Sequence, residues 1–118
     1  MIKILGHGYT VDLSQRLDEM RGNVGVCDLD YLTIKIANDA PQDVKESTLL
    51  HELIEAINYH LELKLKHNQI MGLEVGLYQI FSENGINLGK VLEEREEIND
   101  RNTGKSSGVV LLETKDSA

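Results

Sequence analysis

The segment His51-Glu52-Leu53-Ile54-Glu55 carries the residue types of a metal-binding helix. In an α-helix, residues four apart lie one above the other, so His51 and Glu55 would project from the same side. Zinc accepts imidazole nitrogen and carboxylate oxygen, and a catalytic zinc ion needs three protein ligands and an open position. The segment therefore predicts two ligands of a metal site and requires a third from elsewhere in the chain.

His67 is the candidate for the third ligand. It follows Glu55 by 12 positions, after the bend Leu63-Lys64-Leu65-Lys66. In a helical hairpin, a residue at the start of the second helix can face the first. If His51, Glu55 and His67 bind zinc, Glu52 would be the general base that takes a proton from a water molecule activated by the metal. The reaction would be hydrolysis of a carbonyl substrate, most simply a peptide bond.

A structural interpretation of these residues stays open from the sequence alone. Glu52 and Glu55 could lie on a solvated helix face, where two like charges cost roughly a few tenths of a kcal/mol. His67 could cap the second helix or lie in water. His60 is five positions from Glu55, so we expect it to point away from the His51 face, at the exposed end of the helix.

A long helix from about Pro41 to Leu61 is expected to position the motif. The turn Asn38-Asp39-Ala40-Pro41 precedes it, with Asp39 as a plausible cap. Asp43 would lie in the first turn, where its negative charge interacts favourably with the positive end of the helix dipole. Apolar residues recur along this segment at the helical period: Leu50, Leu53, Ile54, Ile57 and Leu61.

A second helix is predicted from about His67 to Glu83, because apolar residues again follow the helical period and Asn84-Gly85 is a strong stop signal. The acidic segment from Asn87 to Asn99 is expected to hold a third helix. We expect residues 1–99 to form a single domain and residues 100–118 to form a flexible C-terminal tail.

The residues before the first helix predict a small sheet. A short helix from Ser14 to Met20 could lie between two of its strands. The predicted fold class is α+β, a small antiparallel sheet of three or four strands packed against two main helices. The strands are expected in four short segments: Ile2–Leu5, Tyr9–Leu13, Val24–Cys27 and Tyr31–Ile36.

The composition narrows the setting and the partners. The 118 residues suit one domain, and 20 acidic residues against 12 basic ones give a net charge of -8. This charge repels nucleic acids and anionic lipids, so neither is an expected partner. No apolar run approaches the roughly 20 residues of a membrane-spanning helix. The single cysteine, Cys27, and the absence of a signal-peptide pattern favour a reducing cytoplasm.

The stretch from Thr48 to Asn58 resembles the active-site helix of the SprT-like and ImmA/IrrE-like zincins, whose motif is His-Glu-x-x-His. It is also similar to small phage-encoded relatives that continue, as here, into Leu77-Tyr78-Gln79. The resemblance covers roughly residues 2 to 84. It implies a minimal zincin-like fold, with His51 and Glu55 as zinc ligands and Glu52 as the catalytic base.

The chain departs from that motif at one position, because Glu55 stands where those families have their second histidine. A carboxylate adds negative charge, lowers the Lewis acidity of zinc, and also suits manganese or magnesium.

The expected function is therefore a zincin-like metalloprotein in the cytoplasm, that of the host cell if a phage encodes it. A metal-dependent peptidase acting on a peptide or protein substrate is the finer interpretation. The alternative is a non-catalytic protein on the same scaffold that binds a host protein through its acidic surface. A third hypothesis is a nucleic-acid mimic or a decoy for a basic partner, built on the acidic C-terminal segment.

Overall fold

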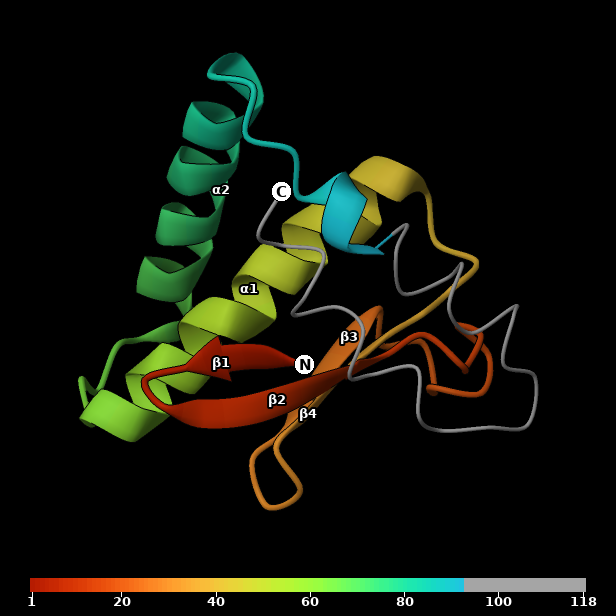
Figure 1. Cartoon of the computed structure of the whole chain (residues 1–118), viewed down its shortest axis with the longest axis horizontal. Helices are drawn as coiled ribbons and strands as arrows, with labels where there is room; N and C mark the ends of the chain where they lie inside the picture. Colours follow the sequence, from red (N-terminus) through yellow and green to blue (C-terminus); the bar gives the residue numbers. More distant parts are fainter. Residues whose placement is uncertain (93–118) are drawn as a thin grey trace.

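A sheet and two helices form three successive layers in the computed structural model, which describes residues 1–92 (Figure 1). Helix α1 (Gln42–Leu61) contacts the sheet on one side and α2 (His67–Glu83) on the other. The α+β class is thus confirmed, and both helices lie within one residue of their predicted bounds. The four strands are β1 (Ile2–Ile4), β2 (His7–Asp12), β3 (Gly25–Asp28) and β4 (Thr33–Ile36).

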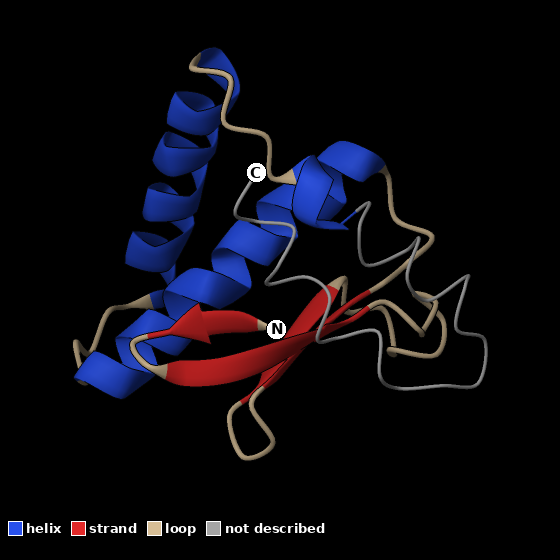
Figure 2. Ribbon diagram, in the orientation of Figure 1, coloured by secondary structure: helices blue, strands red, loops and turns tan. Residues whose placement is uncertain are grey.

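The sheet is mixed rather than wholly antiparallel. Its order is β1-β2-β4-β3, with β1 antiparallel to β2, β2 parallel to β4, and β3 antiparallel to β4. Figure 2 shows the strands in red. The parallel pair arises because residues 13–24 carry the chain past β2 to the far edge, so that β4 returns between β2 and β3. As a result β3 is an edge strand, and α1 lies against it.

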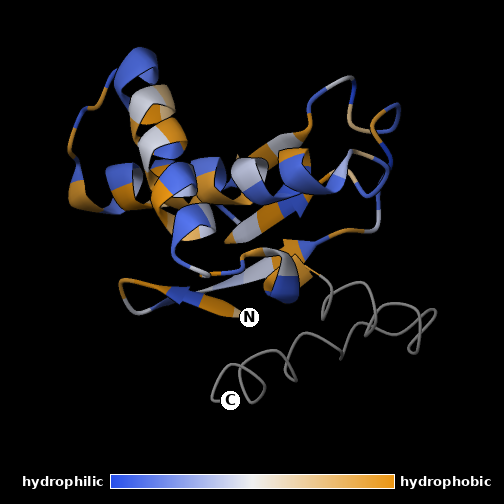
Figure 3. Cartoon of the chain, turned by 90° about the horizontal axis from the view of Figure 1, so that it is seen from above, coloured by the Kyte–Doolittle hydropathy of each residue, from blue (hydrophilic) through white to orange (hydrophobic). Residues whose placement is uncertain are grey.

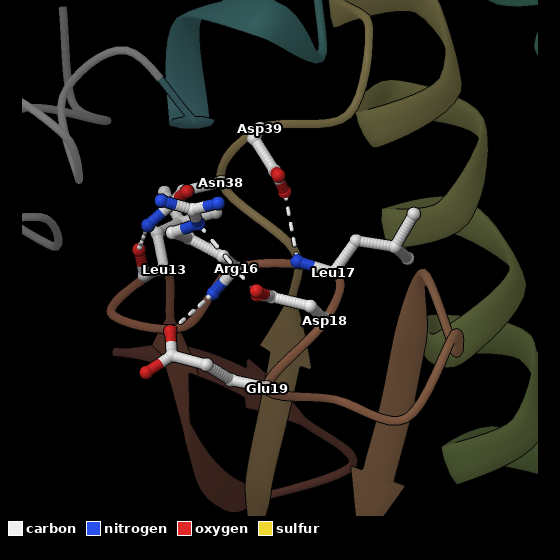
Figure 4. A network of polar contacts seen from close by, with 7 residues as sticks. All are labelled: Leu13, Arg16, Leu17, Asp18, Glu19, Asn38 and Asp39. Atoms are coloured by element: carbon white, nitrogen blue, oxygen red, sulfur yellow. Dashed lines mark hydrogen bonds and ion pairs between the residues drawn. The ribbon is translucent and has the colours of Figure 1, made fainter.

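The short helix expected from Ser14 to Met20 is wrong, because this segment forms turns. Side-chain carboxylates accept hydrogen bonds from two of its backbone N–H groups. Glu19 accepts from the Arg16 N–H and Asp39 from the Leu17 N–H, both at 2.8 Å (Figure 4).

The bond from the Leu17 N–H to Asp39 also explains why the predicted cap at the start of α1 is not formed. Asp39 was expected to cap this helix, but its carboxylate is engaged by Leu17. Pro41 is the N-cap residue and makes no side-chain capping bond, while Asp43 lies in the first turn as predicted. Proline suits this position because it has no N–H group to satisfy.

Two apolar clusters hold α1 between its neighbours. Toward the sheet, Leu49 and Ala56 of α1 are buried with Ile34 and Ile36 of β4. Toward α2, Leu50 and Ile54 are buried with Ile70. In Figure 3, hydrophobic and hydrophilic segments alternate along both helices, as expected for helices with one buried face. The polar residues of the motif lie between these two apolar faces.

Only the start of the expected third helix, Asn87 to Asn99, falls within the described residues, where residues 89–92 are helical. The rest of that segment and the tail of residues 100–118 lie outside them, so both remain predictions. Within residues 1–92, no helix combines the length and apolar character needed to cross a membrane.

Candidate metal centre

The structure brings His51, Glu55 and His67 together at the interface of α1 and α2. Each offers one ligand atom, and these three atoms all lie within 4.8 Å of one another. One helical turn places His51 Nε2 3.3 Å from Glu55 Oε2. The His67 ring, at the start of α2, lies edge-on to the His51 ring with centroids 5.9 Å apart. A metal ion at this position could therefore bind side chains from both helices.

The connection between the helices delivers His67 to this position. Helix α1 ends at Leu61, and the left-handed backbone of its C-cap residue Glu62 (φ 52°) turns the chain back. The Asn58 side chain then accepts a hydrogen bond from the Leu65 N–H at 2.9 Å, which ties the bend to the last turn of α1. Helix α2 begins directly after Lys66, whose backbone N–H donates to the Gln69 side chain at 2.8 Å.

The three side chains could hold a divalent metal ion, and zinc gives a measure of the spacing that this needs. Zinc binds nitrogen and oxygen ligands at about 2.0–2.1 Å, which sets tetrahedral ligand atoms about 3.3–3.4 Å apart. His51 and Glu55 already have this spacing. The widest separation in the group, within 4.8 Å, closes with a shift of about 1.4 Å, and the side chain of exposed His67 is free of core packing to make it.

The site lies at the rim of the helix pair rather than in the core. The side chains of His51 and Glu55 are 18% and 34% exposed, and His67 is exposed. A site of this kind leaves one side open, as catalytic metal sites require and closed structural sites do not.

Glu52 has an environment unlike that of its neighbours on the helix. It is buried, with 7% of its surface exposed. Burial, together with the negative charges of Glu55 and Glu74, raises its pKa to about 7, although His51 acts in the opposite direction. A carboxyl group with this pKa can exchange a proton with water near neutral pH.

Strand β3 packs closely against the Glu52 side chain at Gly25. A Cβ atom at this position would clash with Thr48 and would lie 3.1 Å from Glu52 Oε2. Glycine is therefore required for the strand to approach the helix this closely, and the approach contributes to the burial of Glu52.

An open cleft of about 530 Å³ runs between β3 and α1. Residues of the motif on α1 therefore face the edge strand of the sheet across this cleft. Its lining includes Val26, Cys27, His51, Glu52, Glu55 and Tyr59. Burial and the charges of Glu52 and Glu55 raise the pKa of the Cys27 thiol to about 12. With this pKa, the Cys27 thiol in the cleft wall is protonated at neutral pH.

Strand β3 lines this cleft, and two of its residues direct their backbone hydrogen-bonding groups away from β4. Ala37 N–H donates to the Val24 carbonyl at 2.8 Å, which makes these two residues a hydrogen-bonded pair. Pairs alternate along an antiparallel ladder, so Gly25 and Cys27 turn their backbone N–H and C=O groups away from β4.

Sequence reasoning missed Glu74 of α2. Its Oε1 lies 2.8 Å from His51 Nδ1, and its Oε2 accepts a hydrogen bond from Ser47 Oγ. The signal was present but weak: Glu74 follows His67 by seven residues, two helical turns, and so lies on the same face of α2.

Three further side chains, none of them in the group of candidate ligands, have other partners or surroundings. His60 is not simply exposed at the helix end, because it is bonded to the Tyr9 hydroxyl at 2.6 Å and its ring stacks on His7. The Tyr78 hydroxyl donates to Glu46. Tyr59 is 55% exposed and lines the cleft.

Comparisons with known proteins found no family model, no curated protein and no solved structure that matches this chain. The class of the site is therefore argued from its geometry: two imidazoles and one carboxylate on a helical hairpin, with a second, buried carboxylate beside them.

Proposed function

We propose that this chain is a zincin-like metalloprotein that holds one divalent ion with His51, Glu55 and His67. The observation that carries the proposal is the convergence of these three ligand atoms from two helices. Two histidines and one glutamate are the ligands of several catalytic zinc sites. Glu55 in place of a histidine is thus balanced by a histidine as third ligand, and the summed ligand charge of -1 is ordinary for such a site.

We further propose that the site hydrolyses peptide bonds. A divalent ion bound here would lower the pKa of a coordinated water and polarise a substrate carbonyl. Glu52 supports this activity because it lies on the wall of the same cleft, with its pKa raised to about 7. In this role its carboxylate receives the proton of the attacking water and then donates it to the leaving amine.

The edge of β3 favours an extended peptide as the substrate. Outward backbone groups at Gly25 and Cys27 can pair with a peptide strand laid along the cleft, which would bring its carbonyl groups past His51. Zinc is the ion that these ligands suit best, although the carboxylate of Glu55 also suits manganese or magnesium.

The test is metal-dependent cleavage of an unfolded polypeptide such as fluorescently labelled casein. Metal-free protein, prepared with a chelator, should be inactive and should regain activity with one equivalent of zinc or manganese. Glu52→Gln should bind the same ion without cleaving, whereas the control Glu83→Gln, at an exposed position on α2, should cleave normally. Binding without cleavage in the wild type would favour the non-catalytic, protein-binding alternative, and absence of binding would refute both parts of the proposal.

A further inference from the structure

We infer that Glu74 is a positioning residue that fixes the orientation and the protonated nitrogen of His51, an inference that rests on the proposed metal site. The two ring nitrogens of His51 have separate partners. Nδ1 lies 2.8 Å from Glu74 Oε1, while Nε2 lies 3.3 Å from Oε2 of Glu55, one of the other candidate ligands. Glu74 therefore lies behind the imidazole, on the side away from the metal position.

Ser47 holds Glu74 in this place. The Ser47 hydroxyl donates to Glu74 Oε2, so that both carboxylate oxygens are engaged by α1. Ser47 and His51 are four residues apart and lie on one face of that helix, one turn from each other. The Glu74 side chain is 17% exposed, and its two bonds lock both its position and its direction.

This arrangement decides which nitrogen of His51 can bind a metal. A carboxylate accepts only, so Nδ1 must carry the proton of the bond to Glu74. In the neutral ring, Nε2 then keeps its lone pair, on the side of the ring where Glu55 lies. Carboxylates in this position are common behind metal-binding histidines, where they orient the ring and increase its basicity, and their loss weakens metal binding about 10- to 100-fold.

Glu74 is not the third ligand itself. The ligand atoms that converge within 4.8 Å belong to His51, Glu55 and His67. Both Glu74 oxygens are engaged on the opposite side of the His51 ring. A purely structural tether between α1 and α2 is the competing explanation, and it makes no demand on the tautomer of His51.

The first test uses metal-free protein with 15N-labelled histidine, titrated until the ring is neutral. Long-range proton–nitrogen spectra should show His51 protonated on Nδ1. In Glu74→Ala the proton should move to Nε2, the form that free histidine favours, whereas Glu74→Gln should keep it on Nδ1 because the amide oxygen accepts the same bond. Protonation of His51 on Nε2 in the wild type would overturn the inference, whether or not the protein binds metal.

The second test measures zinc affinity by competition with a chromophoric chelator. Glu74→Ala should bind zinc about 10- to 100-fold more weakly, with smaller losses for Glu74→Gln and Ser47→Ala and no change for the control Glu83→Ala. If Glu74→Ala lowers the melting temperature but leaves both the tautomer and the affinity unchanged, Glu74 is only a tether and the inference is wrong. A wild type with the Nδ1 proton that binds no zinc would refute the proposed function while supporting this inference.

Discussion

Helix α1 carries two histidines in contrasting surroundings. His51, in the middle of the helix, has a carboxylate at each ring nitrogen and a second imidazole at 5.9 Å. His60, near the end, is hydrogen-bonded at Nε2 to the Tyr9 hydroxyl and stacks on His7, with ring centroids 4.1 Å apart and planes within 5°. The same residue type on the same helix is thus surrounded by ligands in one place and by packing partners in the other.

The His60 cluster serves the fold rather than chemistry. Tyr9 is fully buried, and a buried tyrosine hydroxyl needs a hydrogen-bond partner. His60 provides it and so ties β2 to the last turn of α1. The comparison teaches that carboxylates around an imidazole, rather than the imidazole itself, mark a candidate metal site.

The sharpest way to break the comparison is to remove one imidazole from each cluster. His67→Ala should abolish stoichiometric binding of zinc, because only two of the three ligands remain. His60→Ala, its matched control, should bind one equivalent like the wild type. Isothermal titration of both chelator-treated proteins with zinc measures the difference, and equal binding by the two variants would erase the distinction drawn here.

A substitution of Glu52 can separate metal binding from catalysis at the site formed by His51, Glu55 and His67. Glu52→Gln should lower the rate of polypeptide cleavage about 10²- to 10⁴-fold, since general acid–base catalysis contributes that much. Zinc binding should persist, because Glu52 is not among the three ligands. Cleavage assays and metal analysis on the same preparation check both parts, and full activity in the variant would exclude Glu52 as the base.

The raised pKa of Glu52 also predicts a pH-dependent stability of the metal-free protein. Folding raises this pKa from 4.5 to about 7, so the folded state is favoured while Glu52 is protonated, and this contribution is lost as the pH rises through about 7. Glu52→Gln should therefore be more stable than the wild type at pH 8, by roughly a few kcal/mol, given about 1.4 kcal/mol per pKa unit.

Urea unfolding of the two proteins in the presence of a chelator measures this gain at several pH values. The gain should shrink toward pH 5, where Glu52 is protonated in the folded wild type as well. A difference that does not change between pH 5 and pH 8 would contradict the raised pKa.

The smallest expected effect concerns the His60 cluster, in which His60 contacts Tyr9 and His7. Tyr9→Phe removes the hydroxyl that bonds His60 and should cost about 0.5–1.5 kcal/mol of stability, the net contribution of a typical hydrogen bond. Tyr31→Phe is the control, because Tyr31 is 81% exposed. Zinc affinity should be the same in both variants. A weaker affinity in Tyr9→Phe would show that the two clusters are coupled.

The helices could be predicted from the sequence because their signals are local. Apolar periodicity together with Pro41 and Asn84-Gly85 placed both helices within a residue of their bounds. The parallel pairing of β2 with β4 could not be predicted, because it depends on the path of residues 13–24 rather than on any strand's own pattern. The prediction that Asp39 caps α1 was wrong for a related reason, because its carboxylate is bound by the distant Leu17 N–H instead of by the start of the helix.

The candidate site was predictable to the same extent. His51 and Glu55 are one turn apart on a helix, so their proximity follows from spacing alone. The position of His67 could be proposed because a hairpin returns the chain. Glu74 could not, since a single glutamate on a helix is usually solvated and only the packing of α2 on α1 brings it behind His51.

The central claim is that a divalent ion is held by His51 and His67 together with Glu55. Loading 15N-histidine-labelled protein with 113Cd tests it most directly, because the cadmium nucleus couples to the nitrogens that bind it. We predict a single cadmium signal coupled to Nε2 of His51 and to one nitrogen of His67. Cadmium coupled to His7 or His60, or protein that retains no cadmium, would contradict the account.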